Sequence, residues 1–293
     1  MASAVSEQAA GMVHLALPKG RMEQAVFALL ADAGIRVTFG RRGYRPSLSL
    51  AGFETKILKP QNIVEMLHVG SRDIGFAGAD WVAELSAELV ELLDTGLDPV
   101  AVVAAAAPEF EGGGLAPAPF VVASEYQRLT RAWLERRGLR ATFVHSYGAT
   151  EVFPPEDADC IVDNMATGET LKANGLVIVD ELMRSSTRLY AHPSALEHPA
   201  KRERIETLVL LLRSVLDARE RVMLEVNVSA ECLEAVIEVL PSMREPTMAP
   251  LHGDQGFALK AAVPRRDLPR VIPAIKARGG TDIVVTALAQ IVP

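Results

Sequence analysis

Residues 159–171 read DCIVDNMATGETL, and the rest of the chain is organised around this stretch. Ile161 and Val162 supply the apolar body of a predicted short buried strand, and Asp163 stands where that strand should end. Residues 167–170 (TGET) then predict a small-residue loop and the first turn of a helix. Free backbone N–H groups and the positive end of the helix dipole converge at such a turn, so it favours an anion.

An acid directly before an anion-binding turn suits a particular kind of ligand. The carboxylate of Asp163 can accept hydrogen bonds from a sugar diol while the turn after it holds a phosphate, and a phosphoribosyl group presents both features side by side. The alternative is an ordinary strand-to-helix turn in which Thr167 or Thr170 caps the helix. Short loops of Gly and Thr are common, so this stretch alone leaves both interpretations open.

Composition places the chain among ordinary globular proteins. Its 293 residues, 49% hydrophobic and 23% charged, suffice for two or three domains. The net charge of −7 argues against general binding to nucleic acid or to an anionic membrane. Cys160 and Cys232 lie in apolar segments and predict neither a disulfide framework nor a cysteine metal site. No apolar run reaches the length of a membrane span, and residues 1–12 resemble a disordered tail rather than a signal peptide, so the expected compartment is the cytoplasm.

Alternating strands and helices in the first part of the chain predict an open α/β sheet. A strand over 13–17 leads into a loop with Lys19, Gly20 and Arg21, and the helix that follows ends at Gly34. Two cations in such a loop form a second candidate anion site, although loop cations are more commonly just solvated. Ligands of open α/β sheets bind beyond the carboxyl ends of the strands, where this loop is expected to lie.

The same alternation continues along the chain. A strand is predicted over 56–58, and Asn62 is predicted to cap a helix that ends at Gly70. Residues 73–78 predict a strand and a tight turn, after which Asp80 is predicted to cap another helix. Further strands are predicted at 100–107, 120–123, 142–144, 176–179 and 187–190. The last of these is expected to return the chain to the first sheet, leaving a substrate cleft between two lobes.

The C-terminal part of the chain has a different order of predicted elements. After a helix over 198–216, residues 221–288 predict the order strand, helix, strand, strand, helix, strand, as in ferredoxin-like domains. Such small domains often bind a regulatory molecule or pair edge to edge, and no nucleophile, base or metal cluster is visible in this one. The predicted divisions are a disordered tail (1–12), lobe I (13–105 and 186–216), lobe II (106–185) and a C-terminal regulatory domain (217–293).

Five segments carry a resemblance to a known enzyme family, and they follow that family's order along nearly the whole chain after Met12. They are residues 15–21 (LALPKGR), 73–80 (DIGFAGAD), 163–171 (DNMATGETL), 170–176 (TLKANGL) and 240–251 (LPSMREPTMAPL). The chain resembles the ATP phosphoribosyltransferases of the long, self-regulated type, which catalyse the first step of histidine biosynthesis. The resemblance implies an α/β fold with a two-lobed core similar to periplasmic binding proteins. It also implies a C-terminal, ACT-like βαββαβ domain that binds histidine as a feedback inhibitor.

The resemblance further implies roles for individual residues. Asp163 and Glu151 would orient the ribose hydroxyls, and Lys19 is the third residue expected to act in catalysis. The residues expected around the 5′-phosphate are Ala166, Thr167, Gly168, Glu169 and Thr170. The residues expected around ATP or pyrophosphate are Lys19, Gly20, Arg21, Lys59, Gly78 and Asp80. The residues expected around histidine are Thr247, Leu251 and Thr286.

The implied cofactor is Mg²⁺, held mainly by substrate oxygens and water rather than by an all-protein cage. The implied partners are ATP, phosphoribosyl pyrophosphate, and histidine as inhibitor, with neither nucleic acid nor membrane among them. The family assembles as homo-oligomers from dimers to hexamers, which a small domain with exposed strand edges permits.

The chain departs from the family's usual pattern at several positions. Lys59 and Asn62 stand where the family usually has Arg and Asp, and Lys keeps the charge but lacks the bidentate fork of Arg. Glu169 would repel a phosphate unless its side chain points outward. Pro154 and Pro155 are expected to disturb a helix after Glu151.

Two other functional interpretations therefore stay open beside the enzyme. One is a non-enzymatic sensor of nucleotides or amino acids on the same two-lobed fold. The other is a catalytically impaired relative. Release of pyrophosphate in the presence of both substrates and Mg²⁺ distinguishes the enzyme from the sensor.

Overall fold

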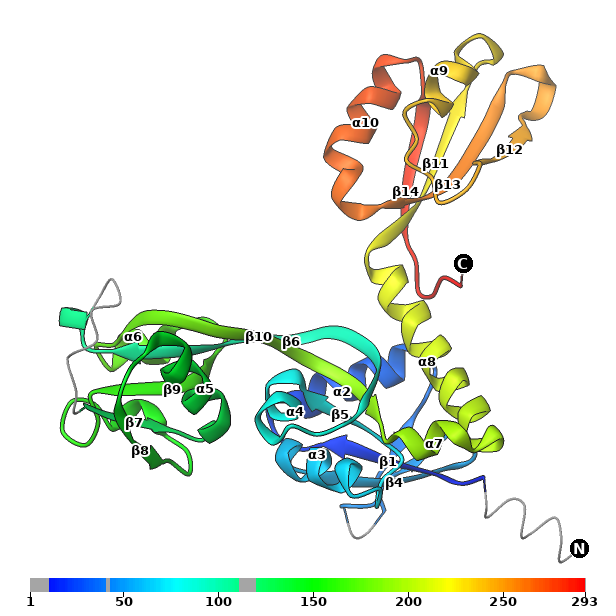
Figure 1. Cartoon of the computed structure of the whole chain (residues 1–293). Coiled ribbons are helices and arrows are strands. Elements are labelled where there is room, and N and C mark those ends of the chain that lie inside the picture. The colour runs from blue at the N-terminus through cyan, green and yellow to red at the C-terminus, as the bar shows by residue number, and fades with distance from the viewer. Residues whose placement is uncertain (1–10, 41–42, 111–119, 293) are drawn as a thin grey trace, which may run out of the picture. The chain divides into compact units, whose positions relative to one another are not determined.

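The structure is a computed structural model that describes residues 11–40, 43–110 and 120–292 (Figure 1). Internal contacts divide the chain into two compact units, Met1–Ala31 with Ile35–Glu206, and Asp32–Gly34 with Thr207–Pro293. The division falls inside helix α8 (Pro199–Arg219), so the domain boundary expected at residue 217 stays a prediction. Most of the expected disordered tail, residues 1–10, lies outside the described residues.

The first unit is built on one mixed sheet of eight strands in the order β4-β1-β5-β10-β6-β9-β7-β8. The strands are β1 (Val13–Pro18), β4 (Phe53–Leu58), β5 (Ile74–Gly78), β6 (Val90–Ala106), β7 (Phe120–Ser124), β8 (Ala141–His145), β9 (Cys160–Met165) and β10 (Val177–Ala191). A separate two-stranded sheet pairs β2 (Val37–Thr38) with β3 (Ser47–Leu48). Parallel strands occupy both ends of the large sheet, and the antiparallel strands β6 and β10 join them (Figure 1).

Both parallel ends of the sheet carry an apolar core, as expected for strands covered on both faces. All five residues of β5 are buried, and so are the last four of β1. Ile63, Val64 and Leu67 pack against one end of the sheet, while Trp133 and Leu134 pack against the other. The unbroken apolar runs that predicted buried strands are explained by this covering.

Seven helices are described in the first unit or extend from it. They are α2 (Arg21–Asp32), α3 (Pro60–His68), α4 (Ala79–Leu85), α5 (Gln127–Arg137), α6 (Glu169–Ala173), α7 (Pro193–Glu197) and α8. Short 3₁₀ turns lie at η1 (Pro108–Phe110) and η2 (Thr150–Val152). Glu151 lies in the 3₁₀ turn η2, and the segment after it, where Pro154 and Pro155 were expected to disturb a helix, contains turns and no helix.

Two predicted helix caps are wrong. Helix α3 begins at Pro60, with Lys59 as its N-cap, so Asn62 lies inside the helix. The fixed φ of proline suits the first helical position, which moves the start of the helix ahead of Asn62. Helix α4 has Gly78 as its N-cap and Asp80 in its first turn, because the Asp80 carboxylate bonds to side chains outside the helix instead.

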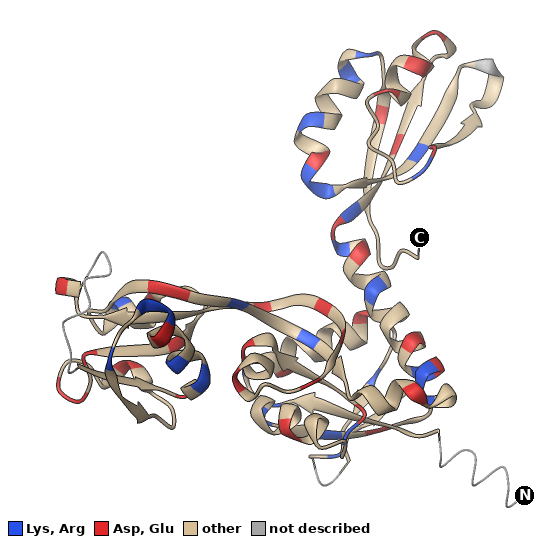
Figure 2. Ribbon diagram, in the orientation of Figure 1, with Lys and Arg blue, Asp and Glu red and all other residues tan. Residues whose placement is uncertain are grey.

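The two long strands correct the sequence prediction most. Strand β6 starts at Val90 rather than at 100, and β10 is one strand where two were predicted at 176–179 and 187–190. Charged residues occupy the middle of this two-stranded ribbon (Figure 2), so its hydrophobic pattern is interrupted although its backbone pairing is not. The register shifts several times along the ladder, which further hides the strand period in the sequence.

The second unit contains the C-terminal sheet, in the order β12-β13-β11-β14. Its elements are β11 (Arg221–Val228), η3 (Ala230–Cys232), α9 (Leu233–Ile237), β12 (Thr247–Pro250), η4 (His252–Asp254), β13 (Phe257–Pro264), η5 (Arg265–Asp267), α10 (Leu268–Ala277) and β14 (Thr281–Ala287). Leu224, Val226 and Ile275 lie in its buried core. The predicted α/β class is confirmed: an α/β core on one mixed sheet is followed by a domain with the order βαββαβ.

Within the described residues, no helix combines the length and the apolarity needed to cross a lipid bilayer.

The close packing of β5 against its neighbours gives a test of the core. In Gly75→Ala, the added Cβ would lie 2.7 Å from Ile63 Cγ2 and 3.1 Å from Ala16 Cβ. Both neighbours are buried, so we expect a loss of about 1–3 kcal/mol in the free energy of unfolding. Urea unfolding followed by circular dichroism measures it. The matched control is Gly40→Ala, whose added Cβ meets no atom within 4 Å; equal stability of the two variants would contradict the packing argument.

Candidate active site

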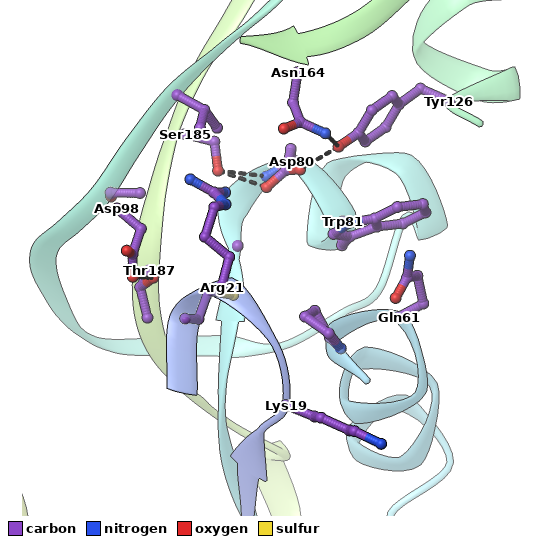
Figure 3. A pocket seen from close by; sticks show the side chains of 15 residues that line it. Lys19, Arg21, Gln61, Asp80, Trp81, Asp98, Tyr126, Asn164, Ser185 and Thr187 are labelled. Carbon is purple, nitrogen blue, oxygen red and sulfur yellow. Dashed lines mark hydrogen bonds between the residues drawn. The ribbon is translucent and has the colours of Figure 1, made fainter. Parts of the chain in front are cut away.

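Two cavities lie at the carboxyl-terminal ends of strands in the first unit. The first, here the loop pocket, measures about 250 Å³ and is lined by Glu151, Asp163, Asn164, Met165, Ala166, Thr167, Gly168, Thr170 and Leu171. The second, here the cleft pocket (Figure 3), measures about 220 Å³ and is lined by Lys19, Arg21, Met22, Pro60, Gln61, Gly78, Asp80, Trp81, Asp98, Val100, Tyr126, Asn164, Ser185, Ser186 and Thr187. Because Asn164 lines both, the two cavities adjoin each other.

The loop pocket is shaped by the end of β9 and the start of α6. Gly168 is the N-cap of α6 with φ of 78°, a left-handed conformation that glycine adopts at little cost. A Cβ at this position would also lie 3.0 Å from Met165 Sδ. The first N–H groups of a helix have no partner within the helix, so this turn offers amide donors to the pocket. The hydroxyls of Thr167 and Thr170 lie on residues of the same lining.

The carboxyl group of Asp163 lines the loop pocket and has an unusually high pKa. Burial raises the pKa of this carboxyl from 3.8 to about 6. The backbone N–H of Asn164, which donates to Asp163 Oδ1 at 2.7 Å, lowers the pKa, whereas the negative charges of Glu151 and Glu125 raise it. Asp163 therefore loses its proton around pH 6, at a position within reach of a ligand in the pocket.

The cleft pocket is organised by the buried carboxylate of Asp80, which is 5% exposed. Tyr126 donates its hydroxyl to Asp80 Oδ2 at 2.6 Å, and Ser185 donates to Asp80 Oδ1 at 2.6 Å (Figure 3). Ser185 Oγ also accepts the backbone N–H of Asp80 at 3.0 Å. Asn164 Nδ2 donates to the Tyr126 hydroxyl at 3.1 Å, and the Tyr126 ring lies 4.8 Å from that of Trp81. This chain of contacts joins α4 and β10 to the end of β9.

The hydroxyl of Tyr126 stays protonated and acts as a donor. Burial, then the adjacent charge of Asp80, raise the pKa of Tyr126 far above its ordinary value of 10. The positive charges of the cleft pocket come from Lys19, which follows β1, and from Arg21, the first residue of α2. The ammonium of Lys19 also lies 5.5 Å from the centre of the Tyr44 ring.

The structure groups most of the predicted site residues into these two cavities. The loop pocket contains Glu151, Asp163, Ala166, Thr167, Gly168 and Thr170. The cleft pocket contains Lys19, Arg21, Gly78 and Asp80. Three predicted residues, Gly20, Lys59 and Glu169, are exposed and line neither cavity.

The predicted histidine contacts are not all brought together. Thr247 is the first residue of β12 and Leu251 follows that strand, whereas Thr286 lies on β14. Strands β12 and β14 are the opposite edges of the C-terminal sheet, with β13 and β11 between them. Within one C-terminal unit, Thr286 is therefore separated from the other two residues.

Sequence reasoning missed several residues of the cleft pocket. Tyr126, Ser185 and Thr187 were not among the predicted site residues, and Ser185 falls between the two predicted strands 176–179 and 187–190. The usable signal was the run of small hydroxyl residues at 185–187, which are all buried in the structure. Among the described residues, no group of three or more His, Cys, Asp or Glu side chains could hold a metal ion.

Two family models match this chain. One, described as ATP phosphoribosyltransferase (HisG), matches residues 59–214, and the other, described as the HisG C-terminal domain, matches residues 218–290. The chain belongs to the ATP phosphoribosyltransferase family. The resemblance and the transferase activity predicted from the sequence are thereby confirmed.

Relatives of this ATP phosphoribosyltransferase chain match it over more than nine-tenths of its length. The ATP phosphoribosyltransferase of Pelotomaculum thermopropionicum is 33% identical over 96% of this chain and 99% of its own length. That of Chlorobium luteolum is 34% identical over 93% of this chain and 95% of its own length. A solved structure, the ATP phosphoribosyl transferase (HisG:HisZ) complex from Thermotoga maritima, has a TM-score of 0.63 at 26% identity and covers 70% of this chain and 99% of that one.

The contact between Tyr126 and Asp80 gives a second test, on this ATP phosphoribosyltransferase chain. Tyr126→Phe removes one of the two side-chain donors from a buried carboxylate, so we expect a loss of about 1–3 kcal/mol in stability. Thermal unfolding of the full chain measures it. Tyr147→Phe is the matched control, because Tyr147 is 92% exposed and should tolerate the change. An unchanged melting temperature in Tyr126→Phe would show that the contact contributes nothing.

Proposed function

We propose that the loop pocket binds the phosphoribosyl group and that the cleft pocket receives pyrophosphate or the triphosphate of ATP. The reaction is ATP plus 5-phosphoribosyl 1-pyrophosphate to N1-(5-phosphoribosyl)-ATP and pyrophosphate, the first step of L-histidine biosynthesis. The observation that carries the assignment is the position of Asp163. Its carboxylate lines one cavity together with Gly168 and its turn, while its neighbour Asn164 lines the next cavity as well.

The loop pocket suits a sugar phosphate because its parts match the two ends of the ligand. The amides after Gly168 and the hydroxyls of Thr167 and Thr170 would hold the 5′-phosphate. Asp163 and Glu151 would accept hydrogen bonds from the ribose hydroxyls. Glu169 is exposed and lies outside the lining, so its charge would not face the phosphate.

Catalysis would depend mainly on position and charge. Adenine N1 attacks the anomeric carbon, the bond from that carbon to the pyrophosphate oxygen breaks, and its electron pair leaves with pyrophosphate. The ring carbon gains positive character in the transition state, as in glycosyl transfer generally, and the ionised Asp163 would stabilise it. Lys19 and Arg21 would neutralise the leaving pyrophosphate, and Gly78 with Asp80 would form the other wall that positions the nucleotide.

The donor set of the loop pocket also fits Mg²⁺, which prefers oxygen ligands and keeps several waters. Glu151 and Asp163 would be the protein oxygens nearest to an ion held mainly by the substrate. When bound, Mg²⁺ would supply positive charge to the leaving pyrophosphate.

The C-terminal unit is proposed to bind histidine as the feedback inhibitor. Thr247 and Leu251 lie together at one edge of its sheet and are the supported pair, whereas Thr286 on the other edge would need a separate contact. The proposed assembly is a homo-oligomer from dimer to hexamer, because β12 and β14 are edge strands with exposed residues. Light scattering distinguishes these states. The proposed compartment is the cytoplasm.

A non-enzymatic sensor on the same fold remains the second candidate, since two cavities and a regulatory domain also suit it. The sensor hypothesis gives no reason for the raised pKa of Asp163 beside the turn at Gly168. Release of pyrophosphate from both substrates with Mg²⁺ supports the enzyme. A failure to release it under any condition supports the sensor, and a normal turnover also dismisses a catalytically impaired relative.

Asp163→Asn tests the central assignment. It removes the charge that would stabilise the transition state, so we expect turnover to fall by roughly 10²–10³-fold. In the wild type, turnover should rise with pH through about 6 as Asp163 ionises. Pyrophosphate release across pH 5–8 measures both. The control is Asp157→Asn, which changes an exposed aspartate outside both cavities and should keep full activity. Full activity in Asp163→Asn would show that the assignment is wrong.

The same variant should separate function from stability. Folding raises the pKa of Asp163 from 3.8 to about 6, so the folded state binds this proton more tightly than the unfolded chain. This stabilisation is complete below about pH 4 and is lost as pH rises through 6. We therefore expect Asp163→Asn to be more stable than the wild type at pH 8, by about 1–3 kcal/mol in urea unfolding. An unfolding free energy lower than that of the wild type would contradict the burial argument.

Inhibition by histidine tests the role of the C-terminal unit. Free histidine should inhibit the wild type, and removal of residues from 221 onward should abolish that inhibition. In the full chain, Thr247→Val should weaken inhibition by roughly tenfold through loss of a hydrogen bond, with basal turnover unchanged. Thr286→Val shows whether the opposite edge of the C-terminal sheet also contributes to histidine inhibition. An unaltered histidine response in the shortened protein would remove the regulatory assignment.

A further inference from the structure

A third cavity lies within the second unit, at one end of the C-terminal sheet. It measures about 380 Å³ and is lined by Arg219, Glu220, Arg221, Pro264, Arg265 and Arg266. We call it the arginine pocket. Its volume falls in the range of roughly 300–1,000 Å³ that small-molecule sites commonly have.

The fold brings two distant segments together to make this pocket. Arg221 and Pro264 form the terminal pair of the β11–β13 ladder, and Pro264 has no N–H with which to extend it. The chain turns there, and Arg265 N donates to Glu220 O at 2.8 Å. This bond joins the residue that follows β13 to the residue that precedes β11. Residues 219–221 and 264–266 are therefore held side by side by main-chain bonds, independently of their side chains.

Four arginines and one glutamate give this lining a net charge of +3. Figure 2 shows basic residues at the passage from α8 into β11 and at the start of α10. Arg219 is partly neutralised, because its guanidinium lies 2.7 Å from Asp32 Oδ2. Within the part of the chain that the structure describes, the guanidinium groups of Arg221, Arg265 and Arg266 have no hydrogen-bond or ion-pair partner.

The charge contrasts with that of the other two cavities. The cleft pocket balances Lys19 and Arg21 against Asp80 and Asp98, and the loop pocket holds two carboxylates and no cation. Like charges held together by the backbone repel one another, and an anion between them removes that repulsion. In a chain of net charge −7, such a concentration of uncompensated positive charge indicates a specific anionic occupant.

The shape of the charged groups narrows the class of anion. A guanidinium presents a planar fork of N–H donors that matches phosphate and carboxylate oxygens in pairs and stays protonated at any physiological pH. A single phosphate is small beside a cavity of about 380 Å³, whereas linked phosphoryl groups can fill it and reach several guanidinium forks at once. We propose that the arginine pocket is a binding site for an oligophosphate, separate from the active site, with pyrophosphate as its simplest member.

Calorimetric titration of the full chain with inorganic pyrophosphate, without substrates or metal, tests the proposal. We expect two classes of site in the wild type, one in the active site and one in the arginine pocket. The double variant Arg265→Ser with Arg266→Ser should lose the second class, with affinity at least roughly tenfold weaker. Both residues are exposed, so the variant should keep the wild-type melting temperature.

The matched control removes the same charge from the same helix region. Arg270→Ser with Lys276→Ser changes two exposed cations on α10 that do not line the pocket, and it should retain both classes. Arg265→Lys with Arg266→Lys keeps the charge and loses the fork, so intermediate affinity is expected. If the control and the serine variant lose pyrophosphate affinity equally, the binding reflects only general charge attraction and the proposal is overturned.

The outcomes for the two sites can be told apart. If the active-site assignment fails, the wild type shows one class, and the serine variant abolishes it. If the arginine pocket takes no oligophosphate, the serine variant binds pyrophosphate with the stoichiometry and affinity of the wild type. Citrate is the remaining comparison, since tighter binding of this tricarboxylate than of pyrophosphate in the second class would overturn the phosphate assignment. Tripolyphosphate and ATP then show whether a free or a nucleoside-linked chain of phosphates fits better.

Discussion

The constraint on which the site depends is the burial of one carboxylate, that of Asp80. A charge removed from water must be met by donors, or the fold loses several kcal/mol. The donors are the hydroxyls of Tyr126 and Ser185, and Tyr126 in turn accepts from Asn164. Asp80 lies in α4, Ser185 in β10, Asn164 in β9 and Tyr126 at the N-cap of α5. Satisfying Asp80 therefore fixes the positions of the cleft walls relative to one another, before any substrate binds.

The long ladder of β6 and β10 makes that arrangement possible. Ser185 sits in β10, and its hydroxyl meets Asp80 at a sequence separation of 105 residues. Near the same point, Thr95 donates its hydroxyl to Thr187 O and Thr187 donates to Asp98, so the irregular part of the ladder is satisfied by hydroxyl groups. Small polar residues suit this region because they can bond to a main chain whose regular register is broken. As a result, the sequence of this part of the ladder lacks the pattern that predicts a strand.

This explains how far the sequence could predict the molecule. Local patterns located the parallel strands, the C-terminal βαββαβ order and the turn after Asp163, because each depends on residues close together in the chain. The same reasoning split β10 into two strands and made Asp80 a helix cap. Asp80 serves partners 46 and 105 residues away, which no local pattern reveals. The burial that raises the pKa of Asp163 is likewise a property of the folded pocket, not of the DNMATGET segment.

The distribution of charge over the cavities gives a physical reason for separate sites. The loop pocket carries carboxylates and no cation, so a phosphate there must be held by amides and hydroxyls. Under the proposed assignment, such a site would accept a sugar phosphate without binding every polyanion tightly. The cleft pocket, with two cations against two acids, is similarly moderate. A strong and permanent attraction for polyanions is incompatible with turnover but suits a ligand that is retained, and the arginine pocket in the other unit has that character.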